Sequence, residues 1–298
     1  MSKIHWLALS MTPGIGGATT RKLVERFGSA EAAFDATDEE LLHVPRITSA
    51  IVEGLRAVSL EALEYELTSM DDEGVSVLTW DDDDYPANLR RASDAPPLLF
   101  MRGNACASDE NAVAIVGTRE PASSSAELAE TLARGLAERG LTIVSGLALG
   151  IDTAAHLGAL NADGGRTLAV LGSGLRVIHP RENALLAEDI VNHGALLSEF
   201  HPGTPPSGPN LMARDRIVSG LSQAVIVVEA GLKSGSMDTA AKARHQGRLV
   251  FAVPGSPGTD DLLGSGASPI DPEDIALDDL VGRVSARPKS DEPQMGLW

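Results

Sequence analysis

Short apolar runs alternate with helical patterns between residues 112 and 253, and this alternation constrains the fold more than any other feature. The runs lie at Ala112–Val116, Thr142–Val144, Thr167–Leu171, Ala195–Leu197, Ala224–Val228 and Leu249–Val253. Helices are predicted between them, near residues 125–139, 151–162, 182–192, 211–221 and 237–246. Short apolar strands separated by helices are typical of a parallel sheet buried on both faces. The sequence therefore predicts an α/β fold with a mainly parallel sheet.

Glycine, serine and cationic residues gather at the predicted carboxyl ends of these strands and at the helix starts beyond them. In an open parallel sheet, ligands bind beyond those ends. Small residues let a ligand approach backbone N–H groups, and the starts of the following helices add positive dipole ends. Several cations at one edge suit a polyanion such as a DNA strand. The candidate residues are Gly117, Thr118, Arg119, Ser145, Gly146, Gly172, Ser173, Gly174, Arg214, Arg216, Lys233, Ser234, Gly235 and Ser236.

Motifs for a dinucleotide or for hydrolysis are missing from this edge. The first strand of the series leads into Gly117–Glu120 rather than into Gly-x-Gly-x-x-Gly, and Gly-x-x-x-x-Gly-Lys-Ser/Thr does not occur. Glu199 and Glu229 each end a strand, and they are either a hydrolytic pair or partners that hold the arginines in place. His156 follows Asp152 by one helical turn, and we expect a structural contact between them rather than acid–base catalysis.

Residues 1–65 are predicted to form a small helical domain. A turn over residues 12–17 separates two helical patterns, and Val44–Ile47 separates a second pair that lacks the glycines. The first copy resembles a helix-hairpin-helix, in which a Gly-x-Gly turn brings backbone N–H groups to a DNA phosphate. The alternative is a plain αα-hairpin whose glycines only permit a tight turn. Residues 66–108 form a connecting segment, with a strand expected over 74–80 and an extended stretch over 95–100.

Composition limits the class of protein. The single cysteine, Cys106, excludes an intrachain disulfide framework and a Cys-cluster metal site. No apolar stretch approaches ~18 residues and no signal-peptide pattern is present, so we expect a soluble, cytosolic protein without a membrane span. The net charge is −18, but residues 109–258 carry 12 Lys and Arg against 15 Asp and Glu. This near-neutral region leaves room for a local positive groove, and the remaining acidity favours solubility.

A series of motifs is shared with a known family. They are Ala114–Arg119, Val144–Asp152 with Ala155-His156, Ala169–Gly174, Leu197–Glu199, Arg214–Ile217, Val228–Ala230, Ser234–Ser236 with Thr239-Ala240, and Ala252–Gly255. Tyr85-Pro86 and Pro96–Leu99 belong to the same series. In order and spacing, these motifs resemble the DNA-processing protein A (DprA/Smf) family over residues 75–268. The N-terminal segment resembles the small helical domain of that family.

The resemblance implies an extended Rossmann-like, doubly wound domain over residues 66–280 that binds single-stranded DNA without sequence preference. It also implies a homodimer that protects incoming strands and helps to load the RecA recombinase during natural transformation or related recombination. It implies neither a cofactor nor catalytic residues, because these proteins are not known primarily as enzymes. The DNA contacts that it carries over are Gly117, Arg119, Gly146, Gly172, Gly174, Arg214, Arg216 and Ser234 to Ser236. Glycines admit phosphates to backbone donors, and arginines neutralise charge and stack on bases.

Several positions depart from the pattern of this family, among them His179, which replaces the usual Tyr before Pro180. Asp215 replaces an Asn between two arginines, Leu211-Met212 replaces an aromatic residue, and Asp238 lies just after the Ser-Gly-Ser motif. A carboxylate beside a DNA strand repels it unless neighbouring arginines pair with it. Two other functions stay open, a nucleotide-binding or nucleotide-hydrolysing enzyme or sensor built on Glu229 and residues 234–236, and an interaction module that brings partners together.

The last residues, 281–298, are rich in Pro, Ser and charge and are predicted to be a disordered tail. The final five residues, Gln294-Met295-Gly296-Leu297-Trp298, resemble the short peptide that binds the bacterial sliding clamp. In that peptide, a Gln, two aliphatic residues and a terminal aromatic fill an apolar pocket, so Gln294, Met295, Leu297 and Trp298 are the candidate contacts. The alternative is an unstructured chain end.

Overall fold

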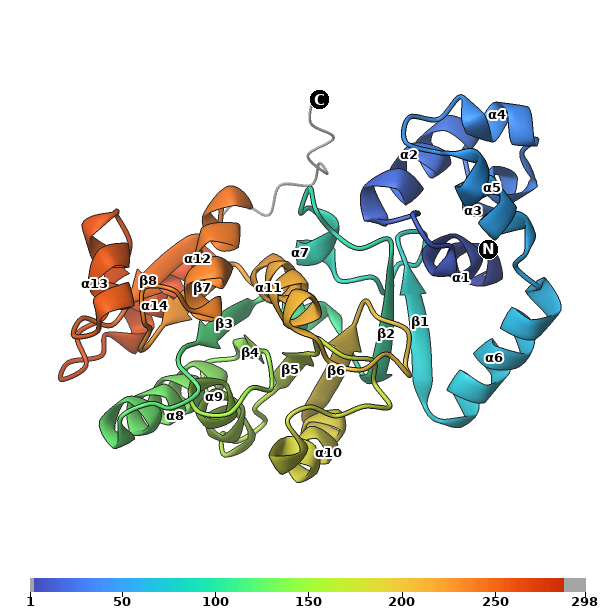
Figure 1. The fold of residues 1–298 in the computed structure, drawn as a ribbon. Coiled ribbons are helices and arrows are strands. Elements are labelled where there is room, and N and C mark those ends of the chain that lie inside the picture. The colour runs from blue at the N-terminus through green and yellow to red at the C-terminus, as the bar shows by residue number, and fades with distance from the viewer. Residues whose placement is uncertain (1–2, 287–298) are drawn as a thin grey trace.

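A computed structural model describes residues 3–286, which form one mixed sheet flanked by helices and extended by a helical N-terminal region (Figure 1). The strands are β1 Val75–Thr79, β2 Leu98–Gly103, β3 Ala112–Val116, β4 Thr142–Ser145, β5 Thr167–Val170, β6 Gly194–Ser198, β7 Ala224–Val227, β8 Leu249–Ala252 and β9 Ser268–Pro269. Across the described residues, the sheet order is β1-β2-β6-β5-β4-β3-β7-β8-β9. Only the pairings of β2, with β1 and with β6, are antiparallel in this sheet.

Helices follow the strands in the alternating pattern that the sequence predicts. They are α7 Ala87–Arg90, α8 Ser123–Ala137, α9 Ile151–Leu160, α10 Ala184–His193, α11 Gly208–Leu221, α12 Gly235–His245, α13 Pro257–Gly264 and α14 Leu277–Ser285, with short 3₁₀ turns at Ala107–Glu110 and Arg181–Asn183. The predicted α/β fold with a mainly parallel sheet is therefore confirmed. None of the described helices is long and apolar enough to cross a membrane.

Alternate residues of the central strands pack into two separate cores. Val113 and Ile115 of β3 face α8, α9 and α14, whereas Ala114 and Val116 face α11 and α12. Because both faces are covered, these strands need apolar residues at nearly every position, which explains their short and continuous runs. The sequence pattern and the layered architecture thus have the same physical cause.

The chain reverses its direction of travel across the sheet beside β3. From β3 it proceeds outward through β4, β5 and β6, and then it crosses back by way of α11 to β7, which pairs with the other side of β3. The helices that follow the neighbouring strands β3 and β7, α8 and α12, consequently lie on opposite faces of the sheet, which makes the carboxyl ends of these strands a topological switch point. Such a point is where open α/β sheets hold their ligands.

The N-terminal region contains two turns of the same design. Its helices are α1 Lys3–Met11, α2 Gly17–Phe27, α3 Ala30–Asp35, α4 Asp38–Leu42, α5 Ser49–Arg56 and α6 Leu60–Asp72. The Ile15 amide donates to Thr12 O at 3.0 Å before α2, and the Ile47 amide donates to Val44 O at 3.1 Å before α5. Gly14 (φ 91°) and Arg46 (φ 76°) occupy the same left-handed position after a proline. The second copy therefore keeps the turn although it has lost the glycines.

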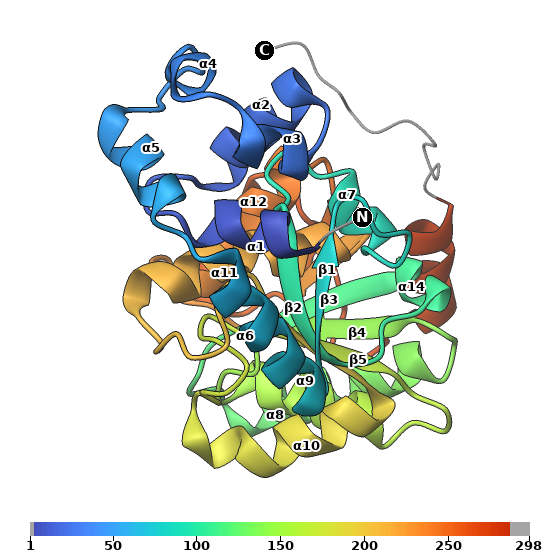
Figure 2. The ribbon, with the colours of Figure 1, turned by 90° about the vertical axis from the view of Figure 1, so that its right-hand side faces the viewer.

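These N-terminal helices share a core with the sheet rather than standing apart from it. Trp6 and Leu7 of α1 belong to the same buried cluster as Val77 of β1 and Phe100 of β2. Figure 2 shows α6 beside β1, and the domain boundary expected at residues 65–66 falls inside this helix. The division into domains stays a prediction. The predicted tail begins at residue 281, so its first residues form the end of α14. The rest of the tail, including the clamp-like peptide, lies outside the described residues.

Candidate nucleic-acid interface

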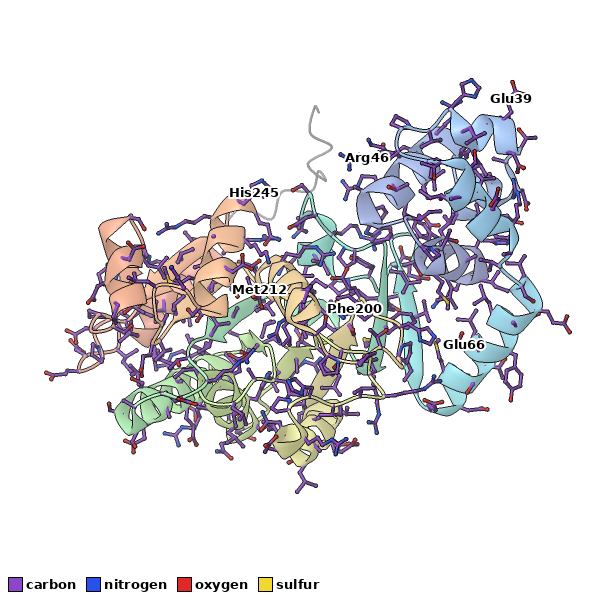
Figure 3. The ribbon with its side chains drawn as sticks, viewed as in Figure 1. Glu39, Arg46, Glu66, Phe200, Met212 and His245 are labelled. Carbon is purple, nitrogen blue, oxygen red and sulfur yellow. The ribbon has the colours of Figure 1, made fainter. Side chains whose placement is uncertain are left out.

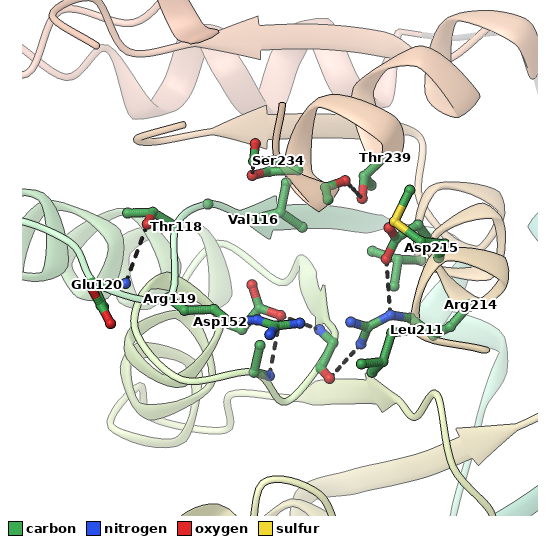
Figure 4. Close-up of a pocket in the computed structure, with 17 residues that line it drawn as sticks. Val116, Thr118, Arg119, Glu120, Asp152, Leu211, Arg214, Asp215, Ser234 and Thr239 are labelled. Carbon is green, nitrogen blue, oxygen red and sulfur yellow. Dashed lines mark hydrogen bonds and ion pairs between the residues drawn. The ribbon is translucent and has the colours of Figure 1, made fainter. Parts of the chain in front are cut away.

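A cavity of about 320 Å³ opens at the switch point, where the carboxyl ends of β3 and β4 meet the amino-terminal end of α12. Arg119, Asp152 and Arg214 line one side of it, and Ser234 and Thr239 line the opposite side (Figure 4). Of the candidate residues, the cavity brings together Gly117, Thr118, Arg119, Gly146, Arg214, Ser234, Gly235 and Ser236. It does not include Ser145, Gly172, Ser173, Gly174, Arg216 or Lys233 among its lining residues.

The loop after β3 presents Arg119 to this cavity. A β-carbon at Gly117 would lie 2.5 Å from an atom of the Ile151 side chain and 2.9 Å from Glu229 O, so this position has room only for glycine. The Thr118 amide donates to the same Glu229 carbonyl at 2.8 Å and fixes the loop against β7. Arg119 is exposed, and its guanidinium has no hydrogen-bond or ion-pair partner among the residues that the structure describes. It is therefore available to a ligand.

The loop after β4 is fixed by hydrogen bonds to Asp152, which lies at the start of α9. Asp152 Oδ2 accepts hydrogen bonds from the amides of Gly146 (3.1 Å) and Ala148 (3.3 Å). Burial raises the pKa of Asp152, while the nearby Arg214 opposes that rise. Ser145 is not among the lining residues of the cavity, and its hydroxyl donates to Ile115 O at 2.7 Å. Ser145 thus ties β4 to β3.

Arg214 is a structural residue even though it borders the cavity. Its side chain is only 7% exposed. Its Nη1 donates to Val170 O at 2.7 Å and to Gly146 O, and its Nε donates to Asp215 Oδ1 at 3.0 Å. These bonds join the ends of β4 and β5 to α11. A β-carbon at Gly146 would collide with this guanidinium, which explains the glycine there.

Arg216 lies outside the cavity and is paired with Glu199. The two guanidinium nitrogens Nη1 and Nη2 each contact one carboxylate oxygen at 2.6 Å, in the bidentate geometry that arginine favours. Glu199 therefore holds an arginine in place, as one of the two sequence interpretations expects. Glu229 instead accepts a hydrogen bond from the Ala122 amide at 3.0 Å and anchors the segment that leads into α8.

The segment 172–174 makes packing contacts within the protein. A β-carbon at Gly172 would lie 2.8 Å from the Leu211 Cα, so this glycine permits α11 to approach β5. The Ser173 hydroxyl donates to Val177 O at 2.7 Å, and the Gly174 amide donates to Thr204 O at 2.8 Å. These contacts hold the loop between β6 and α11. Their DNA-contact role stays a prediction that this placement does not support.

His156 is fully buried and hydrogen-bonds Thr167 rather than the expected Asp152. Its Nδ1 lies 2.7 Å from Thr167 Oγ1, and that hydroxyl donates its own proton to Ile143 O at 2.8 Å. The imidazole must therefore carry its proton on Nδ1. Burial, and then the charge of Arg214, lower the pKa of His156 to about 3, so the ring stays neutral near pH 7. This is a structural histidine.

A second cavity of about 260 Å³ adjoins the first and shares Arg119 with it. Leu149, His179, Pro180 and Glu182 complete its wall, and sequence reasoning did not select any of them for the site. They come from the loops after β4 and β5, and their sequence signals were a position beyond a strand end and, for Leu149, its place within the family motif Val144–Asp152. Leu149 lines the second cavity and is 40% exposed. Met212 lines the first cavity and is 44% exposed. Each cavity therefore has an exposed apolar side chain in its wall.

The fold and this cavity define a class, the Rossmann-like doubly wound domains that hold a ligand at the switch point. Comparison with known proteins narrows that class. A family profile described as DNA recombination-mediator protein A matches residues 76–279, and a DprA-like N-terminal HHH domain matches residues 1–67. The chain belongs to the DprA/Smf family.

Individual relatives agree with this assignment. Protein Smf of Synechocystis is 35% identical over 97% of this chain and 74% of its own length. The DNA processing protein DprA of Streptococcus pneumoniae is 47% identical over 59% of this chain, and that match spans only 61% of the S. pneumoniae protein.

Solved structures of the family share the fold. A crystal structure of S. pneumoniae DprA superposes with a TM-score of 0.83 at 33% identity and covers 95% of this chain and 98% of that chain. A Helicobacter pylori DprA structure, described for its single-stranded DNA binding mode, gives a TM-score of 0.63 at 33% identity over 71% of this chain and 96% of that one.

Proposed function

We propose that this protein binds single-stranded DNA at the switch-point cavity, without sequence preference, and acts as a recombination mediator. The observation that carries the proposal is Arg119, an exposed guanidinium without a protein partner among the described residues, placed where two cavities meet. A phosphate beside it would also face the start of α12, where Gly235 and Ser236 offer amides at the positive end of the helix dipole.

The shape of the site favours a strand over a single nucleotide. The cavities of about 320 Å³ and 260 Å³ share Arg119, Gly146 and Leu211 and give a strand two adjoining places to lie. Contacts to phosphates carry no sequence information. The exposed Leu149 and Met212 offer apolar contact to any base without reading its edge. Binding through charge and apolar contact is therefore independent of sequence.

The candidate acid–base groups near this edge already have partners within the protein or are buried, which supports binding rather than catalysis. Glu199 is held by Arg216, Glu229 by a backbone amide, and His156 is buried and neutral. The alternative, a nucleotide-binding enzyme or sensor, needs Glu229 free to act on a substrate.

We propose further that the protein acts in the cytoplasm as a homodimer and delivers its strand to RecA. Clamp binding through Gln294, Met295, Leu297 and Trp298 also remains a proposal.

Fluorescence anisotropy with labelled oligo-dT, matched duplex and a mononucleotide competitor, across a salt series, tests this function. Arg119→Ala should weaken strand binding about tenfold and reduce the slope of log K against log salt by about one. Arg134→Ala removes the same charge from an exposed position on α8 and is the matched control, expected to stay within about twofold. Failure of the wild-type protein to bind oligo-dT at low salt contradicts the proposal, and stabilisation by mononucleotide alone would favour the enzyme or sensor.

A further inference from the structure

A carboxylate occupies the end of the cavity where an anion would be expected. Asp215 of α11 is 8% exposed, and its Oδ1 accepts from Arg214 Nε at 3.0 Å. Its Oδ2 has no hydrogen bond to the described residues and lies 3.6 Å from the position of a β-carbon on Gly235, the first residue of α12. Figure 4 shows Asp215 on the wall beside Arg214. An acceptor oxygen is thus aimed at the helix start that would otherwise hold a phosphate.

Several charged groups surround Asp215, and one of them, Arg214, is ion-paired with its Oδ1. Those groups are Arg214 on its own helix, Asp238 and Lys242 on α12, Asp152 and the neutral His156 on α9, and Arg119 and Glu120 on the loop after β3. Lys242 is paired with Asp238, and two carbonyl oxygens occupy Arg214 Nη1. Burial consequently raises the pKa of Asp215 to about 6, although Arg214 and Lys242 oppose the rise.

We propose that Asp215 makes phosphate binding in this cavity proton-linked. The ionised carboxylate excludes phosphate from the start of α12, and the protonated carboxyl admits it and donates a hydrogen bond to it. The inference rests on the proposed DNA-binding function and names the residue that determines how strongly the site accepts an anion. Two negative charges a few ångströms apart disfavour each other, so phosphate binding favours the uptake of a proton from solvent by the Asp215 carboxylate.

The expected size of the effect follows from the fraction of protein in the binding-competent form. With half-protonation near pH 6, roughly three-quarters of the molecules are protonated at pH 5.5 and roughly 3% at pH 7.5. Apparent affinity scales with that fraction, so binding of a phosphate strand should weaken about 20-fold between these two pH values. A gain of affinity at acid pH is thus the signature of the proton link.

The test compares wild type, Asp215→Asn and Asp238→Asn by anisotropy, with oligo-dT carrying a pH-insensitive dye at constant ionic strength. Thymine does not titrate in the range from pH 5.5 to 7.5, so the protein accounts for any slope. Asp215→Asn should bind at pH 7.5 about as tightly as wild type binds at pH 5.5, and its affinity should be nearly independent of pH. Asp238→Asn removes a neighbouring charge that raises the pKa of Asp215, so it should keep a proton-linked slope, with the midpoint moved to lower pH.

Calorimetry of the wild-type protein provides a second readout that needs no variant. Near pH 7, titrations in two buffers of different ionisation enthalpy should report uptake of about one proton per bound strand. A slope that persists unchanged in Asp215→Asn, or no proton uptake, overturns the inference and leaves DNA binding intact. Absence of binding by both proteins at every pH would instead overturn the proposed function.

Discussion

Three arginines near one sheet edge have three different roles. Arg119 is exposed and unpaired among the described residues, Arg214 is buried against carbonyl oxygens and Asp215, and Arg216 forms a bidentate pair with Glu199. All three are equally cationic in the sequence. Their burial and partners decide which of them can meet a phosphate, because a guanidinium whose hydrogen bonds are already used gains little from a ligand.

Conservative substitutions should separate these roles. Arg214→Lys removes the planar fork that reaches Gly146, Val170 and Asp215, and it should lower the free energy of unfolding by about 2–3 kcal/mol because buried polar partners are left unsatisfied. Arg119→Lys keeps an exposed charge and should change that free energy by less than about 0.5 kcal/mol. Urea unfolding measures both. Equal stability of the two variants would show that Arg214 is not a structural residue.

At the scale of elements, the repeated turns explain how two hairpins of different sequence keep one geometry. Pro13 and Pro45 precede the left-handed residues Gly14 and Arg46, and a hydrogen bond closes each turn. Glycine adopts this backbone freely, whereas arginine does so at a cost. The second hairpin therefore retains its form through its proline, its hydrogen bond and the packing of Val44 and Ile47 in the core.

Glycine substitutions at and away from this turn test that account. Arg46 is exposed and projects from the N-terminal helices (Figure 3), so Arg46→Gly should stabilise the protein by about 0.5–1 kcal/mol through relief of its backbone. Lys22→Gly, on the exposed face of α2, should destabilise it by about 1 kcal/mol. Urea midpoints report the opposite signs, and destabilisation by Arg46→Gly would contradict the backbone argument.

At the scale of the molecule, the helical region and the sheet are joined through one apolar cluster and several polar contacts. Leu7 and Trp6 pack in the cluster that contains Phe100. Across the same junction, Arg176 contacts Glu73 at 2.6 Å and 2.8 Å, and His201 Nε2 lies 2.5 Å from Glu66 Oε1. A shared core of this kind couples the unfolding of its parts.

A substitution within the shared cluster should therefore affect the whole chain. Leu7 is fully buried, and Leu7→Ala should cost about 2–5 kcal/mol by leaving a cavity. We expect one calorimetric unfolding transition in the wild type, and one transition at lower temperature in the variant. Leu42→Ala, at a surface position of α4 that is 46% exposed, provides the control with little expected change. Two transitions, of which only one shifts, would show that the regions unfold independently.

Local periodicity was sufficient to predict most of the sheet and its helices. Ala112–Val116 forms β3 with the predicted bounds, and Ile151 begins α9 as expected. The edge of the sheet that holds the cavity was also predictable, because parallel strands bring their carboxyl ends to one side. The placement of Gly117, Arg119 and the start of α12 around one cavity follows from that rule.

Sequence alone determined the alternation of elements, the family and the edge where a ligand would lie, because these depend on patterns read along the chain. Only the tertiary structure decided which polar groups are free. The Arg214 guanidinium donates hydrogen bonds to the carbonyl oxygens of Gly146 and Val170. The Ser145 hydroxyl donates to the carbonyl oxygen of Ile115. In each case the partner is distant in sequence. Hydrogen bonds between distant segments leave no local signature, so availability to a ligand is a property of the folded molecule.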